Sequence, residues 1–93
     1  MQKLTEKEIN VMKHCIGLDY KKPYKRHGRE FYKPYRNRYA TYVYNELWNG
    51  LVGKGLAKHM EVNEKQQTMF YLTRNGIDAL GNAIGVYIYD KEN

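Results

Sequence analysis

The ten residues Leu47–Leu56, LWNGLVGKGL, decide the expected fold, because they end a helix and begin a strand within one short run. The end of the helix is indicated by Gly53-Lys54-Gly55, since glycine is favoured just past a helix C-terminus. Its N-cap is either Thr41 or Asn45. Apolar side chains at i, i+3/i+4 spacing form its buried stripe: Val43, Tyr44, Leu47, Trp48, Leu51 and Val52. We therefore expect a helix over about 41–54, with Trp48 in the core.

Two strand candidates and a third helix follow. Leu56–Val62 and Gln67–Leu72 flank a polar turn, which is typical of a β-hairpin. Thr73 is a suitable N-cap for a helix that turns Ile77, Leu80 and Ile84 inward together with the preceding Leu72. The tail Gly85–Tyr89 either extends this helix or forms a small strand.

The N-terminal segment carries strong helix signals. Thr5 and Glu8 have the spacing of a capping box, and Leu4 and Ile9 are placed for a hydrophobic staple. Gly17 is a natural stop, so we expect a helix over about 5–16. With 93 residues the chain has room for one core, which predicts a single α+β domain over 1–93.

The run Leu47–Leu56, followed by the hairpin and Tyr71–Leu80 (YLTRNGIDAL), resembles winged-helix regulators of the MarR type. In that family the recognition helix ends at the Gly-Leu, the hairpin is the wing, and Leu-Thr begins the next helix. The resemblance implies a winged-helix-like fold with three helices and a two-stranded wing. The chain departs from the family because no clear helix precedes the recognition helix.

A second resemblance covers more of the chain. The framework LTEKE at Leu4–Glu8, HCIGLD at His14–Asp19, YRNRY at Tyr35–Tyr39 and LVGKGL at Leu51–Leu56 looks like that of a group of small bacteriophage proteins. This resemblance implies a phage or prophage origin and no particular mechanism. The chain differs in having Tyr39 at the usual Phe and a Lys/Pro/Tyr-rich insertion before Tyr35.

The excess positive charge is concentrated in one segment. The whole chain has a formal charge of +6, and residues 21–38 hold eight Lys/Arg against Glu30 alone. Residues 1–20 are balanced, and residues 39–93 have five basic and six acidic side chains. Charge spread for solubility would not gather in this way, so the segment predicts contact with a polyanion.

We expect this segment to be a basic, Tyr-rich loop at about 20–39, with a short helical turn around Arg29–Lys33. Pro23, Gly28 and Pro34 interrupt any regular period. Cations bind phosphates, and interleaved rings offer faces for bases. The other interpretation is a solvated loop whose tyrosines pack onto the domain. The candidate nucleic-acid-binding residues are Lys21, Lys22, Tyr24, Lys25, Arg26, Arg29, Lys33, Arg36, Arg38, Lys54, Lys58 and Lys65.

Some of these candidates have structural alternatives. Tyr35-Arg36-Asn37 belongs to the shared framework and is equally suited to anchor the fold, with Arg36 pairing an acidic side chain such as Asp19 or Glu46. Lys54 is suited either to the basic surface or to the carbonyl groups at a helix end. The polar tip of the hairpin carries Lys65 as its only cation.

The sequence does not favour catalysis, a cofactor or a metal site. His14, Cys15, His27 and His59 do not have the spacing of zinc ligands. No phosphate-binding glycine loop, HExxH motif or nucleophile with a recognisable base is present. Cys15 is most simply a small apolar residue of the first helix.

We therefore expect a non-catalytic regulatory protein that binds nucleic acid, with DNA as the expected polymer, through the loop at 20–39 and the adjoining helix. The alternative is a phage effector that inhibits an acidic host protein or a host defence complex. The tail Val86–Tyr89 either mediates a homodimer or covers the chain's own core. The N-terminus lacks a signal-peptide pattern, no apolar run is long enough to cross a bilayer, and a lone cysteine fits the cytoplasm of the host cell.

Overall fold

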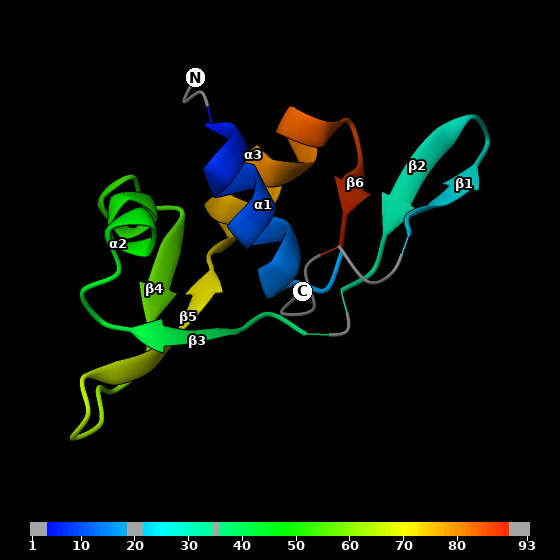
Figure 1. Ribbon diagram of the computed structural model, residues 1–93. Coiled ribbons are helices and arrows are strands. Elements are labelled where there is room, and N and C mark those ends of the chain that lie inside the picture. The colour runs from blue at the N-terminus through cyan, green and yellow to red at the C-terminus, as the bar shows by residue number, and fades with distance from the viewer. Residues whose placement is uncertain (1–3, 19–21, 35, 90–93) are drawn as a thin grey trace.

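The computed structural model describes residues 4–18, 22–34 and 36–89, and Figure 1 shows their arrangement. The elements follow the order α1 (Glu6–Cys15), β1 (Tyr24–Arg26), β2 (Arg29–Tyr32), β3 (Tyr39–Tyr42), α2 (Glu46–Gly53), β4 (Ala57–His59), β5 (Gln67–Leu72), α3 (Arg74–Ile84) and β6 (Tyr87–Ile88). The described residues thus form three helices and six strands in two small sheets, which confirms the expected α+β class.

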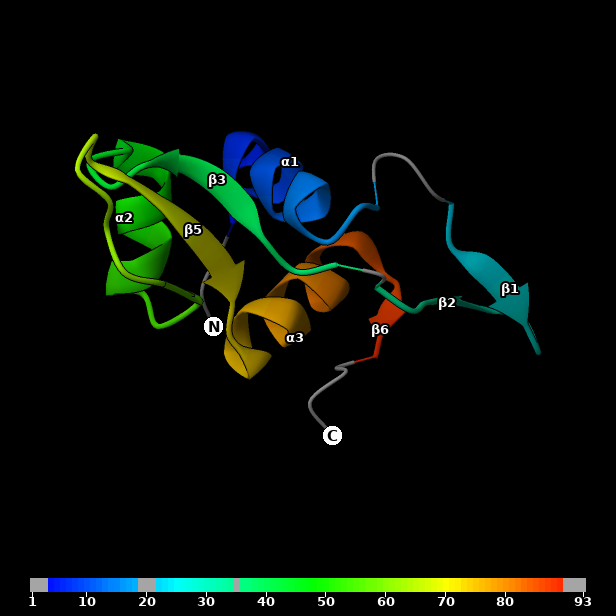
Figure 2. The same ribbon diagram turned by 90° about the horizontal axis from the view of Figure 1, so that it is seen from below.

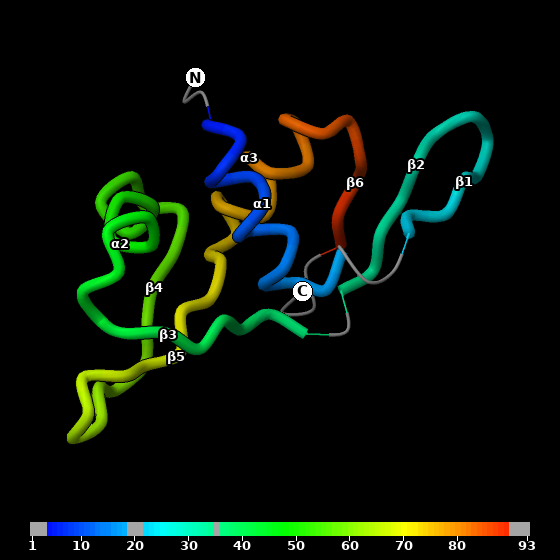
Figure 3. Tube along the Cα trace, in the orientation of Figure 1, coloured from blue at the N-terminus to red at the C-terminus, as the bar shows by residue number. Residues whose placement is uncertain are grey.

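The two sheets lie at different ends of an elongated molecule measuring 48 × 26 × 23 Å (Figures 1 and 2). Sheet A has the strand order β1-β2-β6, and sheet B has the order β3-β5-β4. Helices α1 and α3 lie between them, and α2 lies beside sheet B, as the tube in Figure 3 makes clear. No helix of the described residues is both long and apolar enough to cross a membrane.

Helix α1 begins as expected, because its capping box is formed. Thr5 Oγ1 accepts a hydrogen bond from the Glu8 N–H at 3.1 Å, and Glu8 Oε1 accepts one from the Thr5 N–H at 2.9 Å. Gly17 follows the helix with φ of 79°, a left-handed conformation in which glycine is favoured. The buried side chains Met12, Cys15 and Ile16 place α1 against the core.

Helix α2 is shorter than the expected helix over 41–54. Asn45 is its N-cap and accepts a hydrogen bond from the Trp48 N–H at 3.1 Å. Thr41 instead lies in β3, which pairs with β5, and Val43 and Tyr44 lie in the turn between strand and helix. Pairing with β5 satisfies the backbone here, so the apolar spacing of Val43 and Tyr44 does not extend the helix.

The core is centred on Trp48, whose ring stacks on Phe70 of β5 with centroids 5.3 Å apart. Strand β5 pairs antiparallel with β4 and β3, so it is the central strand of sheet B. Thr73 caps α3 as expected, and Leu72, Ile77 and Leu80 are buried. Gly76 contacts the carbonyl of Leu56 so closely that a Cβ there would overlap it.

Within the basic segment, residues 24–32 do not form the expected loop with a helical turn but an antiparallel β-hairpin that we call the arm (Tyr24–Tyr32). His27 and Gly28 form its two-residue connection with φ of 53° and 77°. Two consecutive positive φ values are those of a type I′ turn, whose twist matches that of the flanking strands. The expected helical turn at Arg29–Lys33 is wrong because Arg29–Tyr32 pairs with β1 as strand β2.

The tail forms strand β6, which settles the choice left open by the sequence. It pairs parallel with β2 in the register Phe31↔Tyr87 and Tyr32↔Ile88. The Tyr32 hydroxyl donates to the Ile16 carbonyl at 2.8 Å, and Tyr32 is buried. The end of β2 is therefore fixed both to Ile16, which follows α1, and to the C-terminal strand β6.

Asn37 joins three segments that are distant in sequence. Its Oδ1 accepts from the Leu72 N–H at 2.8 Å, and its Nδ2 donates to the Leu72 carbonyl at 3.0 Å. The Cys15 thiol also donates to Asn37 Oδ1 at 3.3 Å. Tyr39 pairs with Phe70 in the β3–β5 ladder, so Asn37, two residues earlier, lies opposite Leu72. The Asn37 side-chain amide makes the two hydrogen bonds to Leu72 that a backbone residue of β3 would otherwise make.

Glu8 links α1 to the end of α2. Its carboxylate lies 2.8 Å from Lys54 Nζ, and the Glu8 side chain is only 6% exposed. Burial raises the pKa of Glu8, but Lys54 and Thr5 together more than offset this effect, so the pKa lies below its usual value of 4.5. The ionised form is therefore the one that the folded protein stabilises.

Replacing Asn37 by alanine should lower the free energy of unfolding by about 2–4 kcal/mol, because the N–H and C=O of buried Leu72 both lose their partner. Urea unfolding followed by the fluorescence of Trp48, the sole tryptophan, measures this change. Asn75→Ala, an exposed change on α3, is the control and should stay within about 0.5 kcal/mol. An equally small effect at Asn37 would show that its amide does not hold the ladder.

The Glu8 carboxylate should stabilise the protein above about pH 4.5 and lose this effect as the pH falls through its lowered pKa. Glu8→Gln preserves the capping box but removes the charge that pairs with Lys54. We expect urea unfolding to show a deficit for Glu8→Gln at pH 7 that shrinks towards pH 3. Glu6→Gln, an exposed change in the same turn, controls for the loss of one negative charge. A deficit that does not vary with pH would contradict the role of the ion pair.

Candidate nucleic-acid interface

One face of sheet A carries four aromatic side chains, which we call the aromatic face: Tyr24, Phe31, Tyr87 and Tyr89. Tyr24 lies opposite Phe31 across the β1–β2 ladder, and Phe31 lies opposite Tyr87 across the β2–β6 ladder. Residues paired in this way point to the same face of a sheet. The three tyrosines are exposed despite their size, with exposed fractions of 46% for Tyr24, 56% for Tyr87 and 40% for Tyr89, and Phe31 between them is half-buried.

The rings contact each other around Phe31. Tyr24 and Tyr89 are both stacked with Phe31, with centroids 5.9 Å and 6.2 Å away. Tyr87 makes edge-to-face contacts with both Phe31 and Tyr89, and its ring centroid lies 5.8 Å from that of Phe31 and 4.9 Å from that of Tyr89. The four rings therefore form one contiguous aromatic cluster centred on Phe31.

Cations lie at both ends of the aromatic face. Arg26 and Arg29 are paired across the ladder next to the turn, on the same face as Tyr24 and Phe31, and both are exposed. Lys33, also exposed, follows the root of the arm, and both Arg26 and Lys33 act electrostatically on Tyr89. A hydrogen bond with Tyr24 raises the pKa of Tyr89 above its usual value of 10.0. The Tyr89 hydroxyl is therefore neutral at physiological pH and does not oppose an anionic partner.

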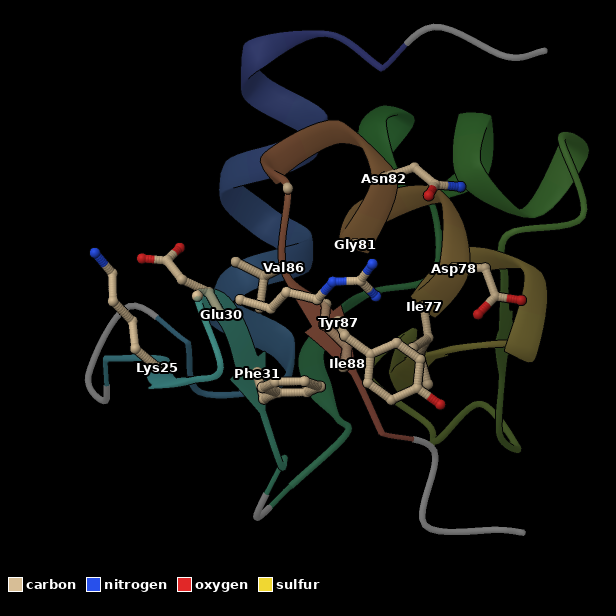
Figure 4. A pocket seen from close by; sticks show the side chains of 13 residues that line it. Lys25, Glu30, Phe31, Ile77, Asp78, Gly81, Asn82, Val86, Tyr87 and Ile88 are labelled. Atoms are coloured by element: carbon tan, nitrogen blue, oxygen red, sulfur yellow. The ribbon is translucent and has the colours of Figure 1, made fainter.

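An open groove of about 1070 Å³ runs beside this face, between the arm and α3 (Figure 4). Lys25, Arg29 and Glu30 line it on the arm, and Asp78 and Asn82 line it on α3. Phe31 and Tyr87 belong to the lining too, so the groove and the aromatic face are continuous. Among the remaining candidates nearby, Lys22 is exposed just before β1, and Lys21 lies outside the described residues.

Arg36 and Asn37 belong to the scaffold, which supports the structural alternative for this part of the framework. The Arg36 Nη2 donates to the His14 carbonyl at 2.7 Å, at the end of α1. The neighbouring Arg38 has an exposed side chain, and its backbone N–H donates to the Cys15 carbonyl at 3.1 Å. Tyr35 and Asp19, which entered the same expectation, lie outside the described residues.

Lys54, Lys58 and Lys65 lie at the other end of the molecule, with α2 and the β4–β5 pair (Figures 1 and 2). Lys54 is held by Glu8, whereas Lys58 and Lys65 are exposed on β4 and in the β4–β5 connection. The expectation that the loop and the helix at 41–54 form one surface is therefore not met. The arm is separate from α2 because its strands belong to sheet A, where β2 pairs with β6.

The exposed positions of α2 do not suit phosphate contact. They are Glu46, Asn49, Gly50 and Gly53, which include one acidic residue and no basic one. The Asn49 amide is already engaged, since it donates to the carbonyl groups of Val43 and Asn45. A helix that reads a duplex normally combines polar side chains with nearby cations, and α2 offers few of either.

Sequence reasoning missed Tyr87 and Tyr89 as site residues. Tyr87 and Tyr89 are more than 50 positions from the arm, and only the parallel β2–β6 pairing brings them beside it. Their one available signal was the alternation Val86-Tyr87-Ile88-Tyr89, in which Val86 and Ile88 are buried and the tyrosines exposed.

Within the described residues, no group of three or more His, Cys, Asp or Glu side chains is arranged to hold a metal ion. Cys15 is fully buried, and its burial raises the pKa of the thiol to about 12. The thiol is therefore neutral and acts as a core residue that also donates a hydrogen bond to Asn37.

Comparison with known proteins does not assign the chain to a family. A scan against protein-family models, a search of curated proteins and a search of solved structures each found no match.

Proposed function

We propose that this protein binds nucleic acid without catalysing a reaction, and that the aromatic face with Arg26, Arg29 and Lys33 is its binding surface. The observation that carries the proposal is the combination of exposed rings and cations on one face of sheet A. Cations neutralise phosphates and release counterions, and aromatic rings add contacts to bases.

The cations of the arm are available for a ligand. Within the residues that the structure describes, no ion pair ties Lys25, Arg26 or Arg29 to an acidic side chain. Like charges face each other at Arg26 and Arg29, directly across the ladder. Such a pair destabilises a hairpin in the absence of a partner, and an anion between the two guanidinium groups would relieve the repulsion.

In this proposal residues 39–84 form a winged-helix-like scaffold and are not the part of the protein that contacts the bases. The order β3, α2, β4, β5, α3 and the antiparallel β4–β5 pair support the likeness to winged-helix regulators. The acidic and glycine-rich exposed positions of α2 argue against reading by that helix. We propose DNA as the polymer and a regulatory role, and the resemblance to small phage proteins favours a phage or prophage origin.

The competing hypothesis is an effector that captures an acidic host protein. The same charges would serve it, so a binding measurement with nucleic acid must separate the two. Absence of binding to any nucleic acid at low micromolar protein and low salt would refute our proposal and direct the search to host proteins.

Reversing the two arm arginines, Arg26→Glu with Arg29→Glu, should abolish DNA binding in low salt while leaving the melting temperature nearly unchanged. The two positions carry like charges before and after the change, so the repulsion across the hairpin is about the same. Fluorescence anisotropy with random-sequence DNA, as duplex and as single strand, at several salt concentrations measures the affinity. For a milder Arg26→Gln with Arg29→Gln variant, the slope of log K against log salt should become shallower by about two.

The matched control is Lys58→Glu with Lys65→Glu, which changes the net charge equally at the other end of the molecule. Its affinity should remain within a few-fold of that of the unmodified protein. Equal losses in the two double variants would mean that net charge, rather than the aromatic face, governs binding.

A further inference from the structure

We infer that the ligand is a single-stranded nucleic acid whose unpaired bases stack on the exposed rings of Tyr24 and Tyr87, which Phe31 supports from between them. This inference rests on the proposed function and adds the class of nucleic acid that the surface selects. Its basis is the exposure of the tyrosines, the spacing of the rings and the position of the cations.

Exposed ring faces need partners that also expose a face. In a duplex each base is stacked above and below, so a protein reaches only base edges and the backbone. Tyr24 and Tyr87 are about half exposed, and they lie in strands rather than on a projecting loop. Unpaired bases of any sequence can stack on such rings, as they do on the aromatic platforms of single-strand-binding proteins.

The ring spacing also fits an extended strand. Neighbouring centroids on the aromatic face are 4.9–6.2 Å apart. Stacked bases in a duplex strand are separated by about 3.4 Å. Bases that occupy adjacent rings must therefore be spread apart, which a single strand permits and a duplex does not.

The cations lie where the backbone of such a strand would run. Arg26 and Arg29 lie at the tip of the arm, and Lys33 lies beyond its root, so the rings are between them. A backbone along the arm would meet a positive side chain at each end of the ring cluster. Beside the rings, the groove contains the exposed amide of Asn82, which can both donate to and accept from a base edge.

The test compares the full chain on four probes of about 15 nucleotides: single-stranded oligo-dT, single-stranded oligo-rU, a random duplex DNA and an abasic DNA strand. We expect the base-containing single strands to bind at least tenfold more tightly than the duplex and the abasic strand, because base–ring stacking adds to the phosphate contacts. Comparing dT with rU distinguishes a DNA from an RNA ligand, and a preference for either supports the inference.

The substitution Tyr87→Leu keeps an apolar side chain in β6 but removes the ring. It should weaken binding to oligo-dT by roughly tenfold and leave binding to the abasic strand unchanged. Tyr44→Leu is the control, since Tyr44 is 64% exposed but precedes α2 at the other end of the molecule. A melting curve for each variant verifies that it is folded.

The outcomes separate this inference from the proposed function. Duplex binding as tight as single-strand binding, or equal affinity for the abasic strand, would overturn stacking while leaving nucleic-acid binding intact. No binding to any of the four probes would overturn the proposed function itself. Unchanged binding by Tyr87→Leu would remove the aromatic face from the interface.

Discussion

The side-chain amide of Asn37 is the contact on which the arrangement of this chain depends. It pairs with the backbone of Leu72 at the end of β5 and accepts a hydrogen bond from Cys15 at the end of α1. One short side chain thereby fixes α1, the central strand of sheet B and the beginning of β3 with respect to each other. The arm is held by other contacts, namely the pairing of β2 with β6 and the hydrogen bond from the Tyr32 hydroxyl to the Ile16 carbonyl.

The two copies of Lys-Pro-Tyr have different structural roles because of this junction. The first copy, at Lys22–Tyr24, leads into β1 and leaves its cation and ring exposed. The second copy begins with exposed Lys33, continues with buried Pro34 and runs on to Arg36 and Asn37, which hold the scaffold. Similar sequences thus divide into one half that meets solvent and one half that supports the fold.

The centre of the core and the aromatic face are built from separate residues. Trp48 and Phe70 lie with the helices and sheet B, whereas the aromatic face lies on sheet A. The link between them is the buried side of sheet A, where Tyr32 and Ile88 pack against the core. Side chains alternate across a strand, so β2 and β6 pack against the core with one face and present the aromatic face on the other.

The helices were predictable because their signals are local: Thr5, Asn45 and Thr73 cap their own helices within three residues. The arm was not, since β1 is exposed at every position and no apolar alternation marks either strand. Its cations were identified from composition, yet the rings of Tyr87 and Tyr89 join them only through pairing with a distant strand. Lys54 was misplaced for a similar reason, because its partner Glu8 lies 46 positions away.

The turn at His27-Gly28 limits how the arm can change in length over evolution. A two-residue turn with both φ values positive holds β1 and β2 in a fixed register. Inserting one residue on each side of the turn lengthens the arm and keeps Tyr24, Phe31 and Tyr87 on one face. Inserting a single residue within one strand would instead carry part of that strand to the opposite face or force a bulge. Relatives of this protein should therefore differ in the length of the arm by even numbers of residues, with the added pairs next to the turn.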